Sequence, residues 1–353
     1  MTQPTHEVKS APFGHGRIVY LDILRIAACA AVILFHVSSQ FWSVTDRSDP
    51  AFAAMRFYDG ISLWGVPVFV MISGALLLGR DEPDLFAKTW KKRIPHVLIL
   101  YAVWGILYGL FSGESSFREL VKAALFGYYH LWYLLMIAGI YCILPLLVPI
   151  AKNRKLLRYF ILLSFAAAAV RMLLKVPAFS RFGEIWANVH LYFVLGYSVF
   201  FLMGYMFHTS ETDDASRGRG KRLLLYAAAV LSFIYGIISM DYEYLSLHYM
   251  AEAAAVFVFV RTLAGMRSRK APKTGRAPET AGSSLTEKLS GLTLGIYLIH
   301  PMVLQSLDRL FGLNTLSFFT WLSIPVIAAA VFCISALISA LLGRIPVLRR
   351  LIR

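Results

Sequence analysis

The chain has 353 residues, of which 58% are hydrophobic and 16% are charged, against about 25% charged residues in an ordinary soluble domain. Its 35 Lys and Arg residues outnumber 20 Asp and Glu residues, which gives a formal net charge of +15. This composition excludes a soluble globular domain and a disordered chain, and the basic residues cluster between apolar runs rather than along one nucleic-acid-binding face. The composition therefore predicts a polytopic membrane protein.

Ten apolar runs of the sequence are each close to the roughly 20 residues that cross a bilayer as a helix. The alternating pattern of membrane β-barrels is absent, so we expect an all-α bundle of about ten transmembrane helices. The runs cover residues 18–42, 61–79, 94–112, 131–150, 156–174, 189–207, 223–240, 245–264, 291–309 and 318–343.

The basic residues of the connecting segments predict the orientation of this bundle. When successive connecting segments are assigned to alternate sides of the membrane, 26 Lys and Arg residues lie on the same side as both termini and 8 lie on the opposite side. Because cytoplasmic loops are enriched in Lys and Arg, both termini are predicted to be cytoplasmic. We expect an amino tail at 1–16, a single bundle at 17–345 with a flexible Pro- and Lys-rich loop at 265–290, and a basic tail at 346–353.

The first run contains three ionisable residues, Asp22, Arg25 and His36. Such groups inside a membrane cost roughly 2.5–3.5 kcal/mol each and commonly mark functional sites. Asp22 and Arg25 are three residues apart, and His36 follows Arg25 by eleven, which is close to three helical turns or about 16 Å. The three side chains are therefore predicted to share one face, directed into the bundle or a wet cavity. The structural alternative is that Asp22 and Arg25 form a buried ion pair and that His36 is a core histidine.

The second run and the segment after it carry two further features. Pro67 frees a backbone carbonyl, and Ser73 with Gly74 allows a neighbouring helix to approach closely. Lys91, Lys92 and Arg93, here called the basic cluster, follow on the cytoplasmic side. This cluster either obeys the positive-inside rule alone or binds phosphate groups.

Later runs supply polar groups that suit either helix packing or an active-site wall. His130 and Trp132 begin the fourth run, where an aromatic belt at the membrane interface also explains the tryptophan. Tyr297 and His300 lie one turn apart in the ninth run. Weaker candidates, for which pairing within the bundle is expected, are His190 and Glu252.

The cysteines add no site to this set. Cys29, Cys142 and Cys333 lie inside apolar runs, and none has a partner at metal-ligand spacing. We therefore predict small buried side chains and no metal site.

Four segments occur in a fixed order across residues 17–343. They are Leu-Asp-Ile-Leu-Arg at 21–25 with His36, Gly-Val-Pro-Val-Phe at 65–69 with Ile-Ser-Gly at 72–74, His-Leu-Trp-Tyr-Leu at 130–134 and Ile-Tyr-Leu-Ile-His at 296–300. Together they resemble the motifs of the acyltransferase-3 family of integral-membrane acyltransferases. The resemblance implies a ten-helix bundle that transfers acyl groups from cytoplasmic acyl-CoA to glycan hydroxyls, and it marks Arg25 and His36 as essential. It also implies the short, stand-alone type without an appended hydrolase-like domain.

In this reaction a hydroxyl attacks a thioester, and we expect His36 to be the base because imidazole titrates near neutral pH. Arg25, oriented by Asp22, is expected to hold a donor phosphate or polarise the thioester, and the basic cluster to attract the nucleotide end of the donor. Residues expected to line the acceptor site or cavity are Ser73, His130, Trp132, Tyr297 and His300.

The expected partners follow from this assignment. They are acetyl-CoA or another acyl-CoA as the donor, a glycan or lipid-linked sugar as the acceptor, and the lipids of a bacterial cytoplasmic membrane. No permanently bound cofactor and no nucleic acid are expected. Two alternatives are a glycan exporter, flippase or small-molecule transporter with the buried Asp, Arg and His along its path, and a sensor that binds a cell-wall precursor. The basic cluster favours acyl transfer, since a transporter needs no site for a nucleotide.

Overall fold

The computed structural model describes residues 17–183, 186, 196–210, 219–239, 246–270 and 281–352. Within these residues the secondary structure is helical and contains no strand. The expected amino tail at 1–16, part of the sixth apolar run and part of the loop at 265–290 lie outside the described residues.

Eight helical segments of the described chain are long and apolar enough to cross a membrane. They correspond to the first five predicted runs and to the seventh, eighth and tenth. These segments are Val19–Ser38, Pro50–Leu77, Leu85–Phe111, Trp132–Lys152, Arg154–Leu174, Gly220–Ser239, Leu247–Met266 and Thr320–Leu342. The predicted all-α polytopic architecture is confirmed.

The individual helices are shorter than these segments where the chain bends. In chain order they are α1 (Val19–Ser38), α2 (Pro50–Gly60), α3 (Gly65–Leu77), α4 (Leu85–Lys88), the π-helical turn η1 (Thr89–Arg93), α5 (Ile94–Phe111), α6 (Phe117–Phe126), α7 (Trp132–Cys142), α8 (Leu144–Lys152), α9 (Arg154–Leu174), the 3₁₀ turn η2 (Ser180–Phe182), α11 (Ser198–Thr209), α12 (Arg219–Ser239), α13 (Leu247–Lys270), α14 (Ala281–Phe311), α15 (Thr320–Leu342) and α16 (Pro346–Arg349). The ninth predicted run lies within α14, and the described part of the sixth forms α11.

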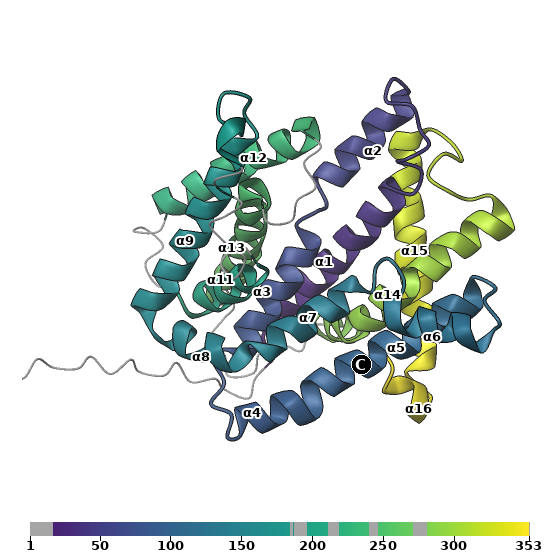
Figure 1. Cartoon of the computed structure of the whole chain (residues 1–353), viewed down its shortest axis with the longest axis horizontal. Coiled ribbons are helices and arrows are strands. Elements are labelled where there is room, and N and C mark those ends of the chain that lie inside the picture. The colour runs from purple at the N-terminus through teal and green to yellow at the C-terminus, as the bar shows by residue number, and fades with distance from the viewer. Residues whose placement is uncertain are drawn as a thin grey trace, which may run out of the picture.

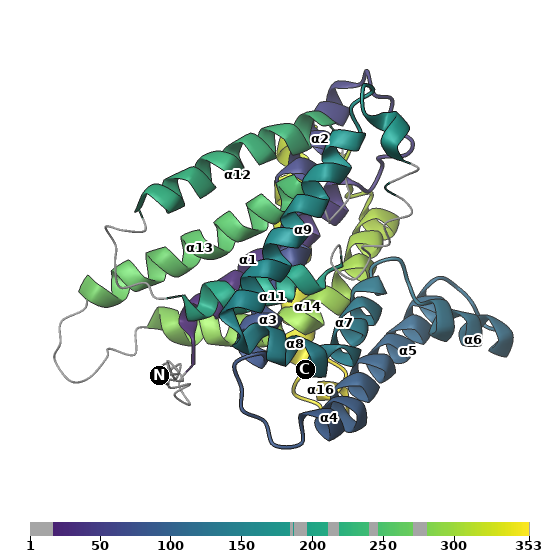
Figure 2. The ribbon, with the colours of Figure 1, turned by 60° about the vertical axis from the view of Figure 1, so that its left-hand side comes forward.

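Helix α1 lies at the centre of the bundle (Figure 1). It packs against α2, α3, α13, α14 and α15, and Leu24, Ala28 and Val37 along it are completely buried. Figure 2 shows α12 and α13 side by side on one flank of α1, with α5 and α6 on the other. Any polar group on α1 is therefore placed among several other helices.

Glycines bring α3 and α11 into close contact. A Cβ atom added to Gly74 would lie 1.8 Å from the carbonyl oxygen of Phe201, and one added to Gly204 would lie 1.9 Å from that of Met71. Glycine has no side chain, so it lets the backbones of α3 and α11 approach this closely. Small residues commonly have this role where membrane helices pack together. The prediction that Gly74 admits a neighbouring helix is confirmed, and that helix is α11.

Candidate functional site

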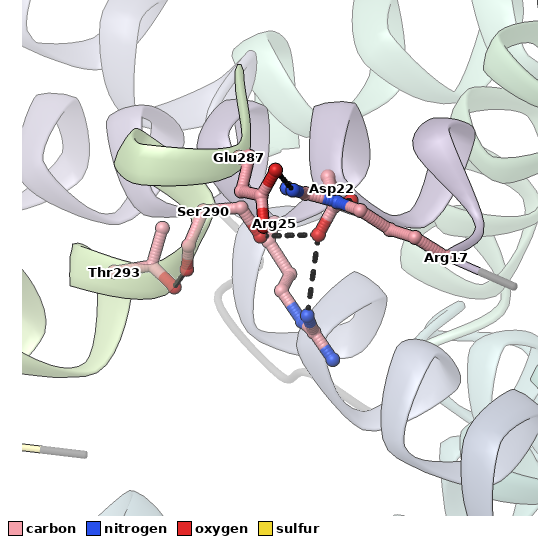
Figure 3. Close-up of polar contacts among 6 residues, drawn as sticks. All are labelled: Arg17, Asp22, Arg25, Glu287, Ser290 and Thr293. Atoms are coloured by element: carbon pink, nitrogen blue, oxygen red, sulfur yellow. Dashed lines mark hydrogen bonds and ion pairs between the residues drawn. The ribbon is translucent and has the colours of Figure 1, made fainter. Parts of the chain in front are cut away.

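Asp22 joins the beginning of α1 to α14 (Figure 3). Arg17 Nε donates to Asp22 Oδ2 at 2.6 Å, and Ser290 Oγ donates to Asp22 Oδ1 at 2.6 Å. Arg17 also pairs with Glu287 Oε2 at 2.5 Å. The contact from Arg25 Nη1 to Asp22 Oδ1 is longer, at 3.4 Å. Asp22 is thus held mainly by Arg17 and Ser290, two partners that sequence reasoning missed.

The Arg25 side chain lines a cavity and remains one-third exposed. The cavity has a volume of about 160 Å³ and is walled by α1, α3, α7 and α14. Within the described residues, the only hydrogen bond of this guanidinium is the 3.4 Å contact with Asp22. Because a guanidinium carries five N–H donors, most of its donor capacity is available to a ligand in the cavity.

His36, near the other end of α1, lines a second cavity of about 200 Å³. Ser62 and Leu63 from the segment before α3 and Tyr129 from the segment before α7 form other parts of its wall. The two cavities share four lining residues, which are Val32, Val66, Tyr133 and Tyr297. Arg25 and His36 therefore face two adjacent cavities along one side of α1.

Three histidines from distant parts of the chain meet at the His36 cavity, which His130 also lines. The ring centroids of His36 and His300 are 5.1 Å apart, and those of His130 and His300 are 5.5 Å apart. His130 and His300 are almost completely buried, whereas His36 is partly accessible. Sequence analysis identified each histidine singly, but no spacing in the chain indicated that α1, α14 and the segment before α7 bring them together.

The remaining residues expected at the cavity differ in their placement. Tyr297 lines both cavities, and its hydroxyl donates to the carbonyl oxygen of His130. Trp132 lines the His36 cavity. Ser73 is absent from the lining of both cavities, and its hydroxyl donates to the Phe69 carbonyl oxygen at 3.1 Å.

The basic cluster lies in η1 and does not line either cavity. Arg93 forms an ion pair with Glu82 and donates to Thr89 Oγ1 at 3.4 Å. Lys91 and Lys92 are exposed. The two lysines are therefore better placed than Arg93 to attract an anion.

Glu252 is completely buried in α13, away from both cavities. Its carboxylate oxygens have no hydrogen-bond partner in the described structure. His190 lies outside the described residues. Sequence analysis also missed Asp59, a buried residue of α2 that accepts a hydrogen bond from Ser38 on α1. No group of three or more His, Cys, Asp or Glu residues within the described ranges could hold a metal ion.

Comparison with known proteins identifies the family to which this chain belongs. The family described as Acyltransferase domain matches residues 18–340. The chain belongs to this family. The family resemblance inferred from the ordered motifs is thereby confirmed, and the protein is a multi-pass membrane protein of an acyltransferase family.

Curated relatives of this acyltransferase occur in Staphylococcus aureus. Proteins from strains MSSA476 and MRSA252, both called "Probable poly-beta-1,6-N-acetyl-D-glucosamine export protein", are 22% identical over 315 residues. The matches cover 84% of this chain and 86% of each relative. No solved structure matches the chain.

Proposed function

We propose that this protein transfers an acyl group, expected to be acetyl, from cytoplasmic acyl-CoA to a hydroxyl of a cell-surface or lipid-linked glycan at the bacterial cytoplasmic membrane. The observation that carries the proposal is the pair of adjacent cavities, one lined by Arg25 and one by His36, with four shared wall residues. The proposal is supported by the position of an arginine and a histidine in neighbouring cavities with common walls.

The separation of Arg25 and His36 along α1 suits an acyl-CoA arm. Arg25 and His36 are eleven residues apart on one helix, or about 16 Å along its axis. A pantetheine arm is long and narrow, so it can extend past Arg25 and bring its thioester to His36. The guanidinium holds a donor phosphate, and Lys91 and Lys92 attract the polyanionic nucleotide end by long-range electrostatics.

The proposed chemistry is a general-base transfer. His36 takes the proton of the acceptor hydroxyl while the hydroxyl oxygen forms a bond to the thioester carbon. The carbon–sulfur bond then breaks, and the leaving thiolate takes a proton from the His36 imidazolium. The products are an ester and free CoA thiol, with no net gain or loss of protons.

A second candidate function is glycan export, which the names of the S. aureus relatives favour. In that case Asp22, Arg25 and His36 line a translocation path rather than a reaction site. The two candidates differ in one requirement, because only the acyltransferase consumes acyl-CoA.

The test uses purified protein in detergent with radiolabelled acetyl-CoA and β-1,6-linked N-acetylglucosamine oligomers among the candidate acceptors. We expect the wild type to release CoA and label an acceptor, and His36→Ala to remain folded but inactive. His96→Ala, which changes an exposed histidine of α5, is the matched control and should keep full activity. Glycan flux into proteoliposomes without acyl-CoA binding or turnover would favour export.

A further inference from the structure

His300 is held in one tautomer by its own helix. Its Nδ1 atom lies 2.7 Å from the carbonyl oxygen of Tyr297. A carbonyl oxygen can only accept a hydrogen bond, so Nδ1 of the neutral imidazole carries the proton and Nε2 presents a lone pair. Nε2 is buried and has no hydrogen-bond partner among the described residues. A buried acceptor of this kind is costly unless a donor reaches it.

Two histidine rings lie beside the His300 ring. His36 is the nearer, at 5.1 Å between ring centroids and an interplanar angle of 34°. His130 lies 5.5 Å away and edge-on, at 80°. The tyrosines in ring contact with these histidines are Tyr297 on α14, Tyr108 on α5, and Tyr128 and Tyr129 before α7. His36 and His130 both line the cavity, but His36 is the only partly accessible ring of the three histidines and is the better placed to meet a substrate while also contacting His300.

We propose that His300 is a positioning residue, whose Nε2 accepts a hydrogen bond from one ring nitrogen of His36 when substrate is bound. The other His36 nitrogen is then unprotonated and directed into the cavity, as a base must be. No hydrogen bond joins the His36 and His300 rings within the described residues. Catalytic hydrogen bonds of this type commonly tighten only in the substrate complex. This role rests on the acyl-transfer function proposed above.

His300 keeps the same protonation state throughout the proposed reaction. His36 gains the proton of the acceptor hydroxyl at its cavity-facing nitrogen and passes it to the departing thiolate. The N–H that His36 donates to His300 stays in place throughout the reaction. His300 therefore acts through His36 and never touches the reacting atoms.

A matched pair of variants, His300→Gln and His300→Met, tests this role. Gln and Met side chains are similar in length and volume, but only Gln carries an acceptor oxygen near the position of Nε2. We expect His300→Met to lower kcat by about 100-fold or more and His300→Gln by less than about 10-fold. The KM for acetyl-CoA should stay unchanged in both variants, since the Arg25 cavity is intact.

The control measurements separate this inference from the proposed function. If the wild type turns over no acyl-CoA, both the proposed function and the proposed role of His300 are overturned. An active wild type with equal kcat in the Gln and Met variants overturns the role of His300 alone. In a His130→Phe background, the difference in kcat between His300→Gln and His300→Met should remain. Loss of that difference would identify His130 as the donor to Nε2 and overturn the proposal.

A measurement on the wild type covers the case in which a variant does not fold. In protein labelled with ¹⁵N-histidine, we expect the His300 signals of a neutral ring protonated at Nδ1. They should change on binding of a non-transferable acyl-CoA analogue, as Nε2 accepts a hydrogen bond. An Nε2-protonated ring, or signals unaffected by the bound analogue, would overturn the proposal.

Discussion

Ser290 on α14 donates a 2.6 Å hydrogen bond to the carboxylate of Asp22 on α1, although the two residues are 268 positions apart in the chain. The same carboxylate accepts a 2.6 Å hydrogen bond from Arg17, and its side chain is only 8% exposed. This contact joins the two helices that carry Arg25, His36 and His300. The stability of the bundle and the alignment of its site are thereby linked.

Asp22→Asn should therefore affect both stability and activity. The substitution keeps the shape of the side chain but leaves Arg17 and Arg25 without their shared anion. We expect a loss of about 1–3 kcal/mol in the free energy of unfolding in detergent, together with reduced transfer. Ser290→Ala, which removes one neutral donor, should cost about 1 kcal/mol. Equal unfolding free energies for wild type and Asp22→Asn would contradict the anchoring role.

Arg25→Lys tests the donor site. Lysine keeps the positive charge but loses the planar fork of N–H donors, so we expect a rise of about tenfold in the KM for acetyl-CoA, equivalent to about 1.4 kcal/mol. Arg25→Ala should raise it further, as measured by initial rates and by direct acyl-CoA binding. Arg118→Lys, on the exposed surface of α6, is the control. Unchanged acyl-CoA affinity in Arg25→Ala would place the donor site elsewhere.

The exposed lysines of the basic cluster should act through long-range electrostatics. Substitution of both Lys91 and Lys92 by Ala should raise the KM for acetyl-CoA by about 3- to 10-fold at low salt, because each exposed charge contributes at most about 1 kcal/mol. The effect should vanish near ~1 M salt, where the screening length is about 3 Å. Lys122→Ala, an exposed lysine of α6, should have no such effect.

Arg93→Ala should behave differently from the lysine variants. Its guanidinium is paired with Glu82 and bonded to Thr89, so its loss should lower stability more than donor affinity. Thermal unfolding and the KM for acetyl-CoA, measured on the same preparation, distinguish the two effects. A salt-dependent rise in KM without loss of stability would assign Arg93 to the donor instead.

Gly74→Ala should disrupt the contact between α3 and α11. The added carbon would lie 1.8 Å from the Phe201 carbonyl oxygen, so the two backbones must separate, at a cost of about 3 kcal/mol or more. Gly139→Ala in α7 has no atom within 4 Å of the added carbon and should stay within about 1 kcal/mol of wild type. Size-exclusion profiles and unfolding in detergent measure both. Wild-type stability in Gly74→Ala would show that the helices can move apart freely.

The second candidate membrane segment contains a contact that the hydropathy of the sequence could not predict. The predicted apolar run covers residues 61–79, and Arg56 and Asp59 are assigned to the outer segment before it. In the structure α3 begins at Gly65, and α2 (Pro50–Gly60) precedes it in the same candidate membrane segment, with Asp59 buried. The hydroxyl of Ser38 on α1 satisfies this carboxyl group, and such a contact between helices leaves no trace in local hydropathy.

The sequence by itself determined the features that depend on neighbouring residues. Apolar runs of bilayer length specify helices, and the spacing between Asp22, Arg25 and His36 follows from the helical repeat. The ordered motifs further identified the acyltransferase family. Each conclusion needs only local composition, periodicity or the order of residues along the chain.

Only the tertiary structure decided which distant groups meet. It placed His130 and His300 beside His36, attached Asp22 to Ser290, and joined the Arg25 and His36 cavities through shared walls. These contacts join residues as far apart in the chain as Asp22 and Ser290, 268 positions, and they depend on how entire helices pack. Helix packing is determined by side-chain fit along all the contacting surfaces, which no local pattern encodes.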